Sequence, residues 1–188
     1  MNPNIPIETE VKLRIPSTRE VAPRLAALGF QLEIAAQTER SVLWDRGTEL
    51  FSQGCALRVR TYGGVAWITW KGPKVKDPLL KIRPEIETSV ASAEAMAGIL
   101  RALGYNPVLA MEKTRALLRR DDLVACLDET PFGCYLELEG ESEAILKAMA
   151  SLGLGPELAE LRSYPALFLE HGCASQKFPS PTCDESAG

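Results

Sequence analysis

The sequence predicts an α+β fold in which eight strands close into an antiparallel β-barrel with helices packed on its outside. Segments that alternate charged and apolar residues recur along the chain, and glycine-containing turns separate them. Helical patterns interrupt this series at intervals, and an even number of antiparallel strands can close into a barrel. We expect one domain over residues 1–171, because no linker divides the chain, and a disordered tail over residues 172–188.

The first third of the chain is expected to form strand, helix and strand. Ile7–Ile15 (IETEVKLRI) alternates at period two, which is typical of a strand with two different faces. The capping box Ser17–Glu20 then starts a helix that ends at Gly29. A second strand is expected at about Gln31–Asp45.

The middle of the chain predicts a hairpin, one more strand and a helix. Cys55–Tyr62 and Val65–Lys71 both alternate, and the Gly-Gly pair between them is typical of a hairpin turn. Leu79–Thr88 alternates again, and Ser92–Leu103 has the pattern of a short amphipathic helix.

The last part of the domain predicts three strands followed by helix. The strands are expected at Pro107–Arg119, Leu123–Asp128 and Phe132–Glu139. A helix is expected at Glu141–Leu152, and Leu161–Glu170 has room for one or two further helical turns. The count of expected strands is therefore about eight.

Composition excludes several classes of protein. The net charge of −4 argues against a general nucleic-acid binder, and no apolar run approaches the roughly 20 residues of a membrane helix. The N-terminal residues 1–7 lack the basic start and apolar stretch of a secretory signal. The five cysteines are widely spaced without a CxxC, which argues against a disulfide framework or zinc site. We expect a cytoplasmic protein without a membrane partner.

The charged faces of the strands are unusual because charges of like sign repeat on one face. Amphipathic strands ordinarily turn their charged face to water, but like charges two residues apart repel unless counter-charges or ions lie between them. If the apolar face packs against the helices, the charges line the barrel. The interior would then hold these acids and bases: Glu8, Glu10, Glu85, Glu87, Asp128, Glu137 and Glu139, with Lys12, Arg14, Arg58, Arg60, Lys71, Lys81, Arg83, Lys113 and Arg115.

Such an interior requires water, ions and a highly charged ligand, because unpaired buried charge is prohibitive. Clustered carboxylates without histidine or cysteine favour Mg²⁺ or Mn²⁺. Arginines and lysines favour a polyanion, and the guanidinium group matches phosphate oxygens. Together they indicate a metal–polyphosphate complex. The chain has no Walker-type loop, so side chains must bind the phosphates.

The motif Glu8–Lys12 (ETEVK) resembles the ExExK signature of the CYTH superfamily, the triphosphate tunnel metalloenzymes. The match spans roughly residues 5–169, with the motifs in the family's order. The further segments that resemble family motifs are Leu57–Arg60 (LRVR), Thr69–Pro73 (TWKGP), Arg83–Glu87 (RPEIE), Glu112–Arg115 (EKTR), Leu127–Glu139 (with LD, Gly133 and ELE) and Arg162–Leu167 (RSYPAL).

The resemblance implies an eight-stranded tunnel that is open at both ends, and it implies roles for its residues. The implied metal ligands are Glu8, Glu10, Asp128, Glu137 and Glu139. The implied triphosphate-binding residues are Lys12, Arg58, Arg60, Lys71, Arg83, Lys113 and Arg115. The candidate catalytic residues are Glu8, Glu10, Lys12 and Lys71, and Glu85 and Glu87 have accessory roles.

The layout is similar to the class IV adenylyl cyclase and thiamine triphosphatase branch of that superfamily. The resemblance implies metal-dependent hydrolysis of a triphosphate, whether inorganic triphosphate, a nucleoside triphosphate or thiamine triphosphate. Conversion of ATP to cyclic AMP and pyrophosphate is the first alternative, and polyphosphate or nucleotide binding without catalysis is the second. The expected partner is a triphosphate-containing small molecule, and the sequence leaves monomer and homodimer open.

Overall fold

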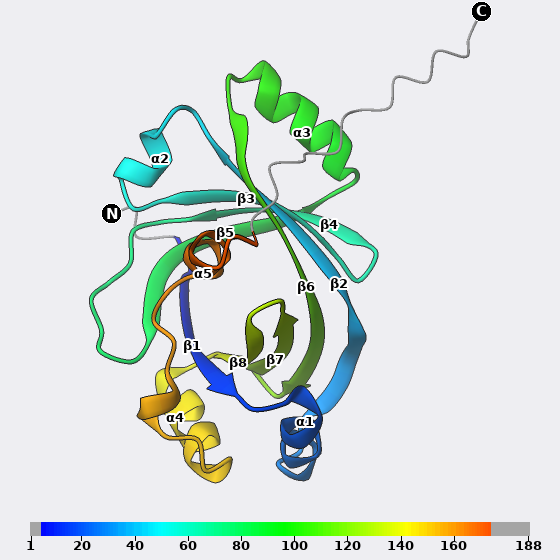
Figure 1. Cartoon of the computed structure of the whole chain (residues 1–188), viewed down its shortest axis with the longest axis vertical. Helices are drawn as coiled ribbons and strands as arrows, with labels where there is room; N and C mark the ends of the chain where they lie inside the picture. The colour runs from blue at the N-terminus through cyan, green and yellow to red at the C-terminus, as the bar shows by residue number, and fades with distance from the viewer. Residues whose placement is uncertain (1–4, 174–188) are drawn as a thin grey trace, which may run out of the picture.

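Eight strands form one closed antiparallel barrel in the computed structural model, which describes residues 5–173 (Figure 1). The predicted α+β barrel is thereby confirmed. Of the predicted tail, residues 174–188 lie outside the described residues. The strands are β1 Ile7–Ile15, β2 Gln31–Asp45, β3 Ala56–Tyr62, β4 Val65–Lys71, β5 Lys81–Val90, β6 Asn106–Arg120, β7 Leu123–Thr130 and β8 Gly133–Glu139.

Two meanders build the barrel, and β1 joins them on one side. Around the wall the order is β1-β5-β4-β3-β2-β6-β7-β8. Strands β2 to β5 follow one another, as do β6 to β8. Strand β1 pairs with both β5 and β8, and the long strands β2 and β6 pair with each other. The closed wall leaves no unpaired sheet edge, and it brings the first and last strands into contact.

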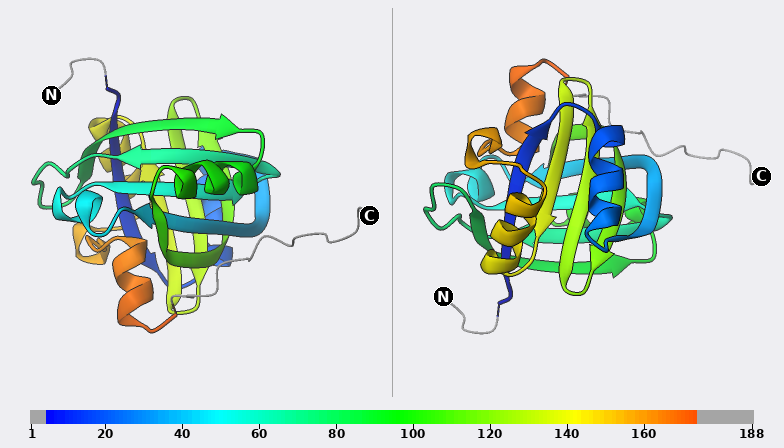
Figure 2. Two further views of the ribbon diagram at one scale, coloured as in Figure 1. Left: turned by 90° about the horizontal axis from the view of Figure 1, so that it is seen from above. Right: turned by 90° about the horizontal axis from the view of Figure 1, so that it is seen from below.

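Helices cover opposite outer sides of the barrel, with α3 on one side and α1 and α4 on the other (Figure 2). The short helix α2 follows β2, and α5 lies across one opening of the barrel (Figure 1). The sequence patterns did not predict α2 or the 3₁₀ turn η1, because elements of three or four residues show no periodicity. The helices are α1 Thr18–Ala27, α2 Glu49–Ser52, α3 Ala93–Ala102, α4 Ser142–Ser151, η1 Pro156–Leu158 and α5 Tyr164–Glu170.

The apolar core lies between the barrel wall and the outer helices. Leu13 of β1 and Leu138 of β8 are completely buried in the same cluster as Leu25 of α1 and Ile145 of α4. Burial of each such side chain contributes about 1.5–3 kcal/mol. Because the apolar faces of these strands point outward, the alternating charged residues must point inward. Within residues 5–173, no helix is long and apolar enough to cross a bilayer.

Candidate functional site

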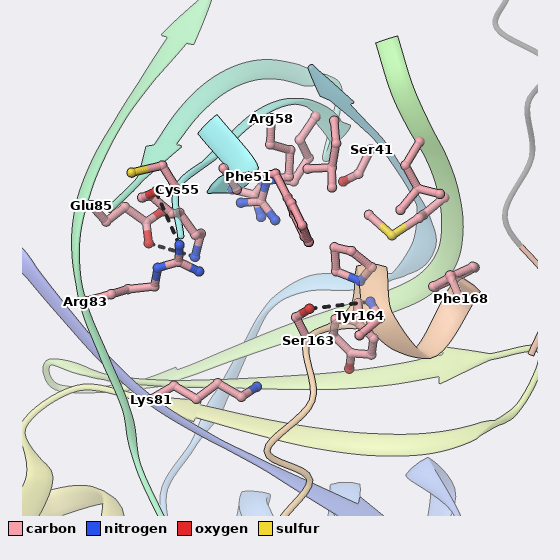
Figure 3. A pocket seen from close by; sticks show the side chains of 18 of the residues that line it. Ser41, Phe51, Cys55, Arg58, Lys81, Arg83, Glu85, Ser163, Tyr164 and Phe168 are labelled. Carbon is pink, nitrogen blue, oxygen red and sulfur yellow. Dashed lines mark hydrogen bonds and ion pairs between the residues drawn. The ribbon is translucent and has the colours of Figure 1, made fainter. Parts of the chain in front are cut away.

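A cavity of about 1080 Å³ occupies the barrel interior and reaches the opening beside α2 and α5 (Figure 3). The inner faces of the strands line it. The structure therefore brings together most of the residues that the sequence indicated, although they come from strands far apart in the chain. The predicted site residues that line the cavity are Glu8, Glu10, Arg58, Arg60, Lys71, Arg83, Glu85, Glu87, Lys113, Arg115, Glu137 and Glu139.

One side of the cavity, which we call the acidic wall, consists of Glu8, Glu10, Glu85 and Glu139. Strand pairing aligns Glu10 with Glu139 across β1 and β8. The Nζ atom of Lys71 lies 2.7 Å from carboxylate oxygens of both Glu8 and Glu85. The acidic wall thus surrounds the lysine with more carboxylates than one ammonium group can neutralise.

The pKa values in the acidic wall reflect this excess of negative charge. Burial and the neighbouring Glu85 carboxylate raise the pKa of Glu8 to about 7, against the opposing charge of Lys71. Burial, together with Glu8 and Glu10, raises the pKa of Glu139 to about 7. Because Glu139 is exposed, water screens it more than it screens Glu8. The buried Glu8 is therefore the clearer sign that a cation would be favoured here.

The opposite side, which we call the basic wall, consists of Arg58, Arg60, Lys113 and Arg115 around the buried carboxylate of Glu39. The Glu39 oxygens lie 3.5 Å from Arg60, 3.7 Å from Lys113 and 3.6 Å from Arg115. These are long contacts, and Oε2 of Glu39 has no hydrogen-bond partner. Although burial alone would raise it, the pKa of Glu39 is lowered by Lys113 and Arg115. Four bases of the basic wall thus surround the single carboxylate of Glu39.

Sequence reasoning missed Glu39. The charge pattern indicated residues in pairs of like charge two positions apart. Glu39 is a single acid, and its inward neighbour on β2 is Ser41. The alternation of inward and outward residues along β2 would have placed it on the inner face. Strand pairing places Glu39 beside Lys113, and Ser41 beside Arg60.

Glu87 holds the two arginines of β3 in place. Its carboxylate lies 3.0 Å from Arg60 and 3.4 Å from Arg58. The hydroxyl of Thr69 donates a hydrogen bond of 2.5 Å to the same carboxylate. This geometry fits the accessory role predicted for Glu87, since it orients bases from the side of β5.

Asp128 lies behind the basic wall and is not one of the cavity-lining residues. Its carboxylate is completely buried and accepts hydrogen bonds from Arg115 at 2.6 Å, from Lys113 at 2.9 Å and from the hydroxyl of Tyr164 at 2.5 Å. Glu137, which does line the cavity, contacts Arg115 at 2.5 Å. In this arrangement Asp128 and Glu137 orient bases, and their predicted roles as metal ligands remain predictions.

Lys12 is also buried beneath the cavity surface. Its Nζ donates to the carbonyl oxygen of Arg162 at 2.5 Å and lies 4.1 Å from the centre of the Tyr164 ring. Burial, assisted by the charge of Lys81, lowers the pKa of Lys12 to about 7. Tyr164, which lies in the motif segment Arg162–Leu167, therefore contacts both Lys12 and Asp128 from α5.

Arg83 faces the cavity but donates to the backbone. Its guanidinium group lies 2.8 and 2.6 Å from the carbonyl oxygen of Gly72. It therefore anchors the segment that follows β4, beside Lys74, which also lines the cavity. The predicted phosphate contact of Arg83 remains a prediction.

The acidic wall fits a hard divalent cation by its chemistry. Its donors are carboxylate oxygens, which Mg²⁺ and Mn²⁺ prefer, and burial together with mutual repulsion raises the pKa of Glu8. Across residues 5–173, no three acidic, histidine or cysteine side chains are already arranged as a complete cation site. The carboxylates instead contact Lys71 and Lys81.

Known proteins resemble this chain in sequence and in fold. A chain from Methanocaldococcus jannaschii, provisionally named an adenylate cyclase, is 30% identical over 154 residues, covering 78% of this chain and 87% of that protein. A Vibrio parahaemolyticus structure, provisionally named an adenylate cyclase, has a TM-score of 0.77 at 18% identity and covers 87% and 98% of the two chains.

A Hippeastrum structure, provisionally called an adenylyl cyclase and described as having a dominant triphosphatase activity, has a TM-score of 0.64 at 19% identity. It covers 87% of this chain and 96% of that one. At these identities the two structures support the fold. The family model described as the CYTH domain matches residues 6–152. With that match over most of the barrel, the chain belongs to the CYTH domain family.

Proposed function

We propose that this protein hydrolyses a triphosphate in its barrel cavity with the help of a divalent cation. The observation that supports this most directly is the opposition of the acidic and basic walls across one cavity. A cation complements the first wall, and a polyanion complements the second. A metal–triphosphate complex supplies both charges in one ligand.

The basic wall would hold the phosphate oxygens. Arg58 and Arg60 come from neighbouring positions of one face of β3, and Glu87 fixes both guanidinium groups. Lys113 and Arg115 extend the same surface on β6, with Asp128 behind them. Fixed positive groups of this kind stabilise the charge that develops on phosphoryl oxygens without reorganising during the reaction.

The acidic wall would hold the cation through Glu8, Glu10 and Glu139. A divalent cation supplies charge neutralisation on phosphoryl oxygens and lowers the pKa of bound water. Lys71 lies between Glu8 and Glu85, where it is poised to contact either a phosphate oxygen or the carboxylates. Lys12 lies beneath the cavity surface, whereas Asp128 and Glu137 contact the bases of the basic wall.

Adenylyl cyclase activity is the second candidate, because the Methanocaldococcus relative bears that provisional name. The CYTH family includes both adenylyl cyclases and triphosphatases. Hydrolysis is the first candidate because a fold neighbour with a cyclase name is described as predominantly a triphosphatase.

Product analysis separates these activities. The protein is incubated with tripolyphosphate, ATP or thiamine triphosphate in the presence of Mg²⁺ or Mn²⁺. Release of orthophosphate supports hydrolysis, whereas cyclic AMP with pyrophosphate establishes the cyclase. Metal-enhanced binding without any product identifies a non-catalytic binder and overturns the proposal.

A matched pair of variants tests the basic wall. Arg58→Ala removes a cavity arginine, and Arg40→Ala removes an exposed arginine that pairs with Glu112 on the outside. We expect Arg58→Ala to raise KM for the triphosphate about tenfold or more, because hydrogen bonds to charged groups contribute about 1.5–3 kcal/mol. Equal KM values for the two variants would remove Arg58 from the binding surface.

A further inference from the structure

Tyr164 lies at the start of α5, where it joins the cavity lining beside Ser163 (Figure 3). The hydroxyl of Ser163 accepts a hydrogen bond of 3.4 Å from the backbone N–H of Ala166, which fixes the first turn of the helix. Phe168 of the same helix is buried. The ring of Tyr135 packs edge to face against the ring of Tyr164, with 5.7 Å between their centres. The ring of Tyr164 is therefore held both by its helix and by a neighbouring ring.

Two ammonium groups lie close to this one ring. The Nζ atom of Lys113 is 3.9 Å from its centre, and the Nζ atom of Lys12 is 4.1 Å from it. The two lysines come from β6 and β1, and their like charges repel each other. The face of an aromatic ring carries partial negative charge and attracts both. Tyr164 thus stabilises two like charges in one place.

An aromatic ring leaves more positive charge for a ligand than a further carboxylate would. A carboxylate placed between the two lysines would neutralise charge that a triphosphate requires, whereas the ring carries no net charge. Lys113 lines the cavity, and Lys12 lies beneath its surface. Fixed charges at such positions stabilise the negative charge that develops on a phosphoryl group. The ring therefore holds the ammonium groups and leaves their charge intact.

The hydroxyl of Tyr164 reaches Lys113 by a second route. It donates a hydrogen bond of 2.5 Å to Oδ2 of Asp128. The same oxygen accepts hydrogen bonds from Lys113 at 2.9 Å and from Arg115 at 2.6 Å. One side chain of α5 thus contacts two bases of the basic wall, one through its ring and both through Asp128.

The backbone before Tyr164 holds Lys12 at both of its ends. The carbonyl oxygen of Arg162 accepts a hydrogen bond of 2.5 Å from the ammonium group of Lys12. The backbone N–H of Glu160 donates a hydrogen bond of 2.7 Å to the carbonyl oxygen of Lys12. The segment that leads into α5 therefore fixes the position of Lys12 as well.

We infer that Tyr164 is a positioning residue for the reaction, because its ring places the ammonium groups of Lys12 and Lys113 for the triphosphate. This inference rests on the proposed function, since the two lysines affect turnover only if the triphosphate lies beside them. Tyr164 acts through the lysines, so its removal should have its full effect only while both lysines are present.

The test is a pair of double-mutant cycles that join Tyr164→Leu with Lys12→Met and with Lys113→Met, assayed with tripolyphosphate and Mg²⁺. Alone, Tyr164→Leu should lower kcat about a hundredfold or more, because the contact of each ammonium group with the ring accounts for about tenfold. In either lysine variant, the factor by which Tyr164→Leu lowers kcat should be about ten times smaller. The same factor in all three backgrounds would overturn the inference.

Tyr105→Leu is the matched control. Arg46 lies 5.6 Å from the centre of the Tyr105 ring, so this tyrosine also has a cation beside it. Tyr105 packs with Trp44 and Leu100 in the apolar cluster on the outside of the barrel wall. We expect wild-type kcat in Tyr105→Leu, and melting temperatures verify that each variant folds. An equal loss of kcat in Tyr105→Leu and Tyr164→Leu would contradict a specific role of Tyr164.

Graded weakening of the ring face tests the inference with little change in packing, and it decides the question if Tyr164→Leu does not fold. Tyr164→Phe keeps the ring and removes the hydroxyl. Tyr164→trifluorophenylalanine keeps the shape of the ring, but its fluorine atoms withdraw electrons from the face that attracts the ammonium groups. We expect kcat about threefold to tenfold lower in the fluorinated variant than in Tyr164→Phe. Equal kcat values for these two variants would overturn the role of the ring.

Failure of the proposed function is a separate outcome. If the wild-type protein releases no product, hydrolysis is excluded, and the same cycles are measured as dissociation constants of non-hydrolysable imidotriphosphate by calorimetry. These dissociation constants also complete the cycle for any double variant without measurable turnover. A smaller loss of affinity on Tyr164→Leu in each lysine variant than in the wild-type background supports the positioning role. Equal losses in all backgrounds, or no binding by the wild-type protein, would overturn it.

Discussion

Glu8 and Glu39 are both buried glutamates that face the same cavity, but their environments shift their pKa values in opposite directions. Glu8 shares Lys71 with Glu85, and its pKa rises to about 7. Glu39 lies among Arg60, Lys113 and Arg115, and the pKa of its carboxyl falls. Burial opposes ionisation at both positions, so the neighbours decide the outcome.

This difference shows how one cavity is prepared for a ligand that carries both signs of charge. The acidic wall has more carboxylates than its lysines neutralise, and a cation would relieve the repulsion. The basic wall gathers four bases around Glu39, and a polyanion in the cavity would contact them. Three substitution or titration experiments would test this distinction.

The largest effect is expected for Glu8→Gln, which preserves the size of the side chain and removes a charge from the acidic wall. We expect kcat for metal-dependent turnover to fall about a hundredfold or more, because fixed charge at the reacting phosphoryl group is lost. Steady-state product release over a range of Mg²⁺ and Mn²⁺ concentrations measures it.

Glu112→Gln, on the outer surface of β6, is the matched control for that experiment and should have wild-type turnover. Melting temperatures verify that both variants fold. Wild-type activity and metal dependence in Glu8→Gln would show that the acidic wall does not hold the cation.

Glu39→Gln should have a smaller effect of opposite sign. Replacing the acid at the centre of the basic wall with a neutral amide increases the positive potential there, so affinity for a non-hydrolysable triphosphate analogue should rise about three- to tenfold. Calorimetric titration measures the dissociation constant, and Glu33→Gln, an exposed position of the same strand, is the control. Weaker binding in Glu39→Gln would mean that Glu39 orients the bases instead of competing with the anion.

The smallest effect is expected in the stability of the metal-free protein as a function of pH. Because the pKa of Glu8 is raised in the folded state, the folded protein binds more protons than the unfolded chain between about pH 4.5 and 7. Stability from this group is present below that range and is lost as pH rises through it. The melting temperature should therefore fall by several degrees between pH 5 and 7.5.

Glu8→Gln should flatten this pH dependence, and scanning fluorimetry or calorimetry measures both proteins. Below about pH 4.5, the lowered pKa of Glu39 makes stability fall as the pH falls. The pH ranges in which Glu8 and Glu39 affect stability therefore do not overlap. A melting temperature of the wild-type protein that rises between pH 5 and 7.5 would contradict the assignment to Glu8.

The fold could be predicted from sequence because alternation along a strand is local. In β1, the charged residues from Glu8 to Arg14 and the apolar residues between them separate onto two faces whatever the strand pairs with. The same reasoning found most residues of the two walls. It missed Glu39, because this residue does not belong to a repeated charge pattern.

The pairing that closes the barrel and the burial of individual side chains could not be predicted in this way. The pairing of β1 with β5 and β8 joins residues more than seventy positions apart, and it alone places Glu8, Glu85 and Glu139 on one wall. Lys12 and Asp128 share the inward face, yet both are buried beneath the cavity surface by α5 and its Tyr164.

The sequence by itself determined which residues share a face, which charges are present and, through its motifs, which family the chain resembles, since all of these follow from order along the chain. The tertiary structure decided which faces meet, which carboxylate lies beside cations or beside other carboxylates, and that Tyr164 contacts Lys12 and Asp128. Those outcomes depend on distances between segments far apart in sequence. The electrostatic energy of a buried charge is set by such distances.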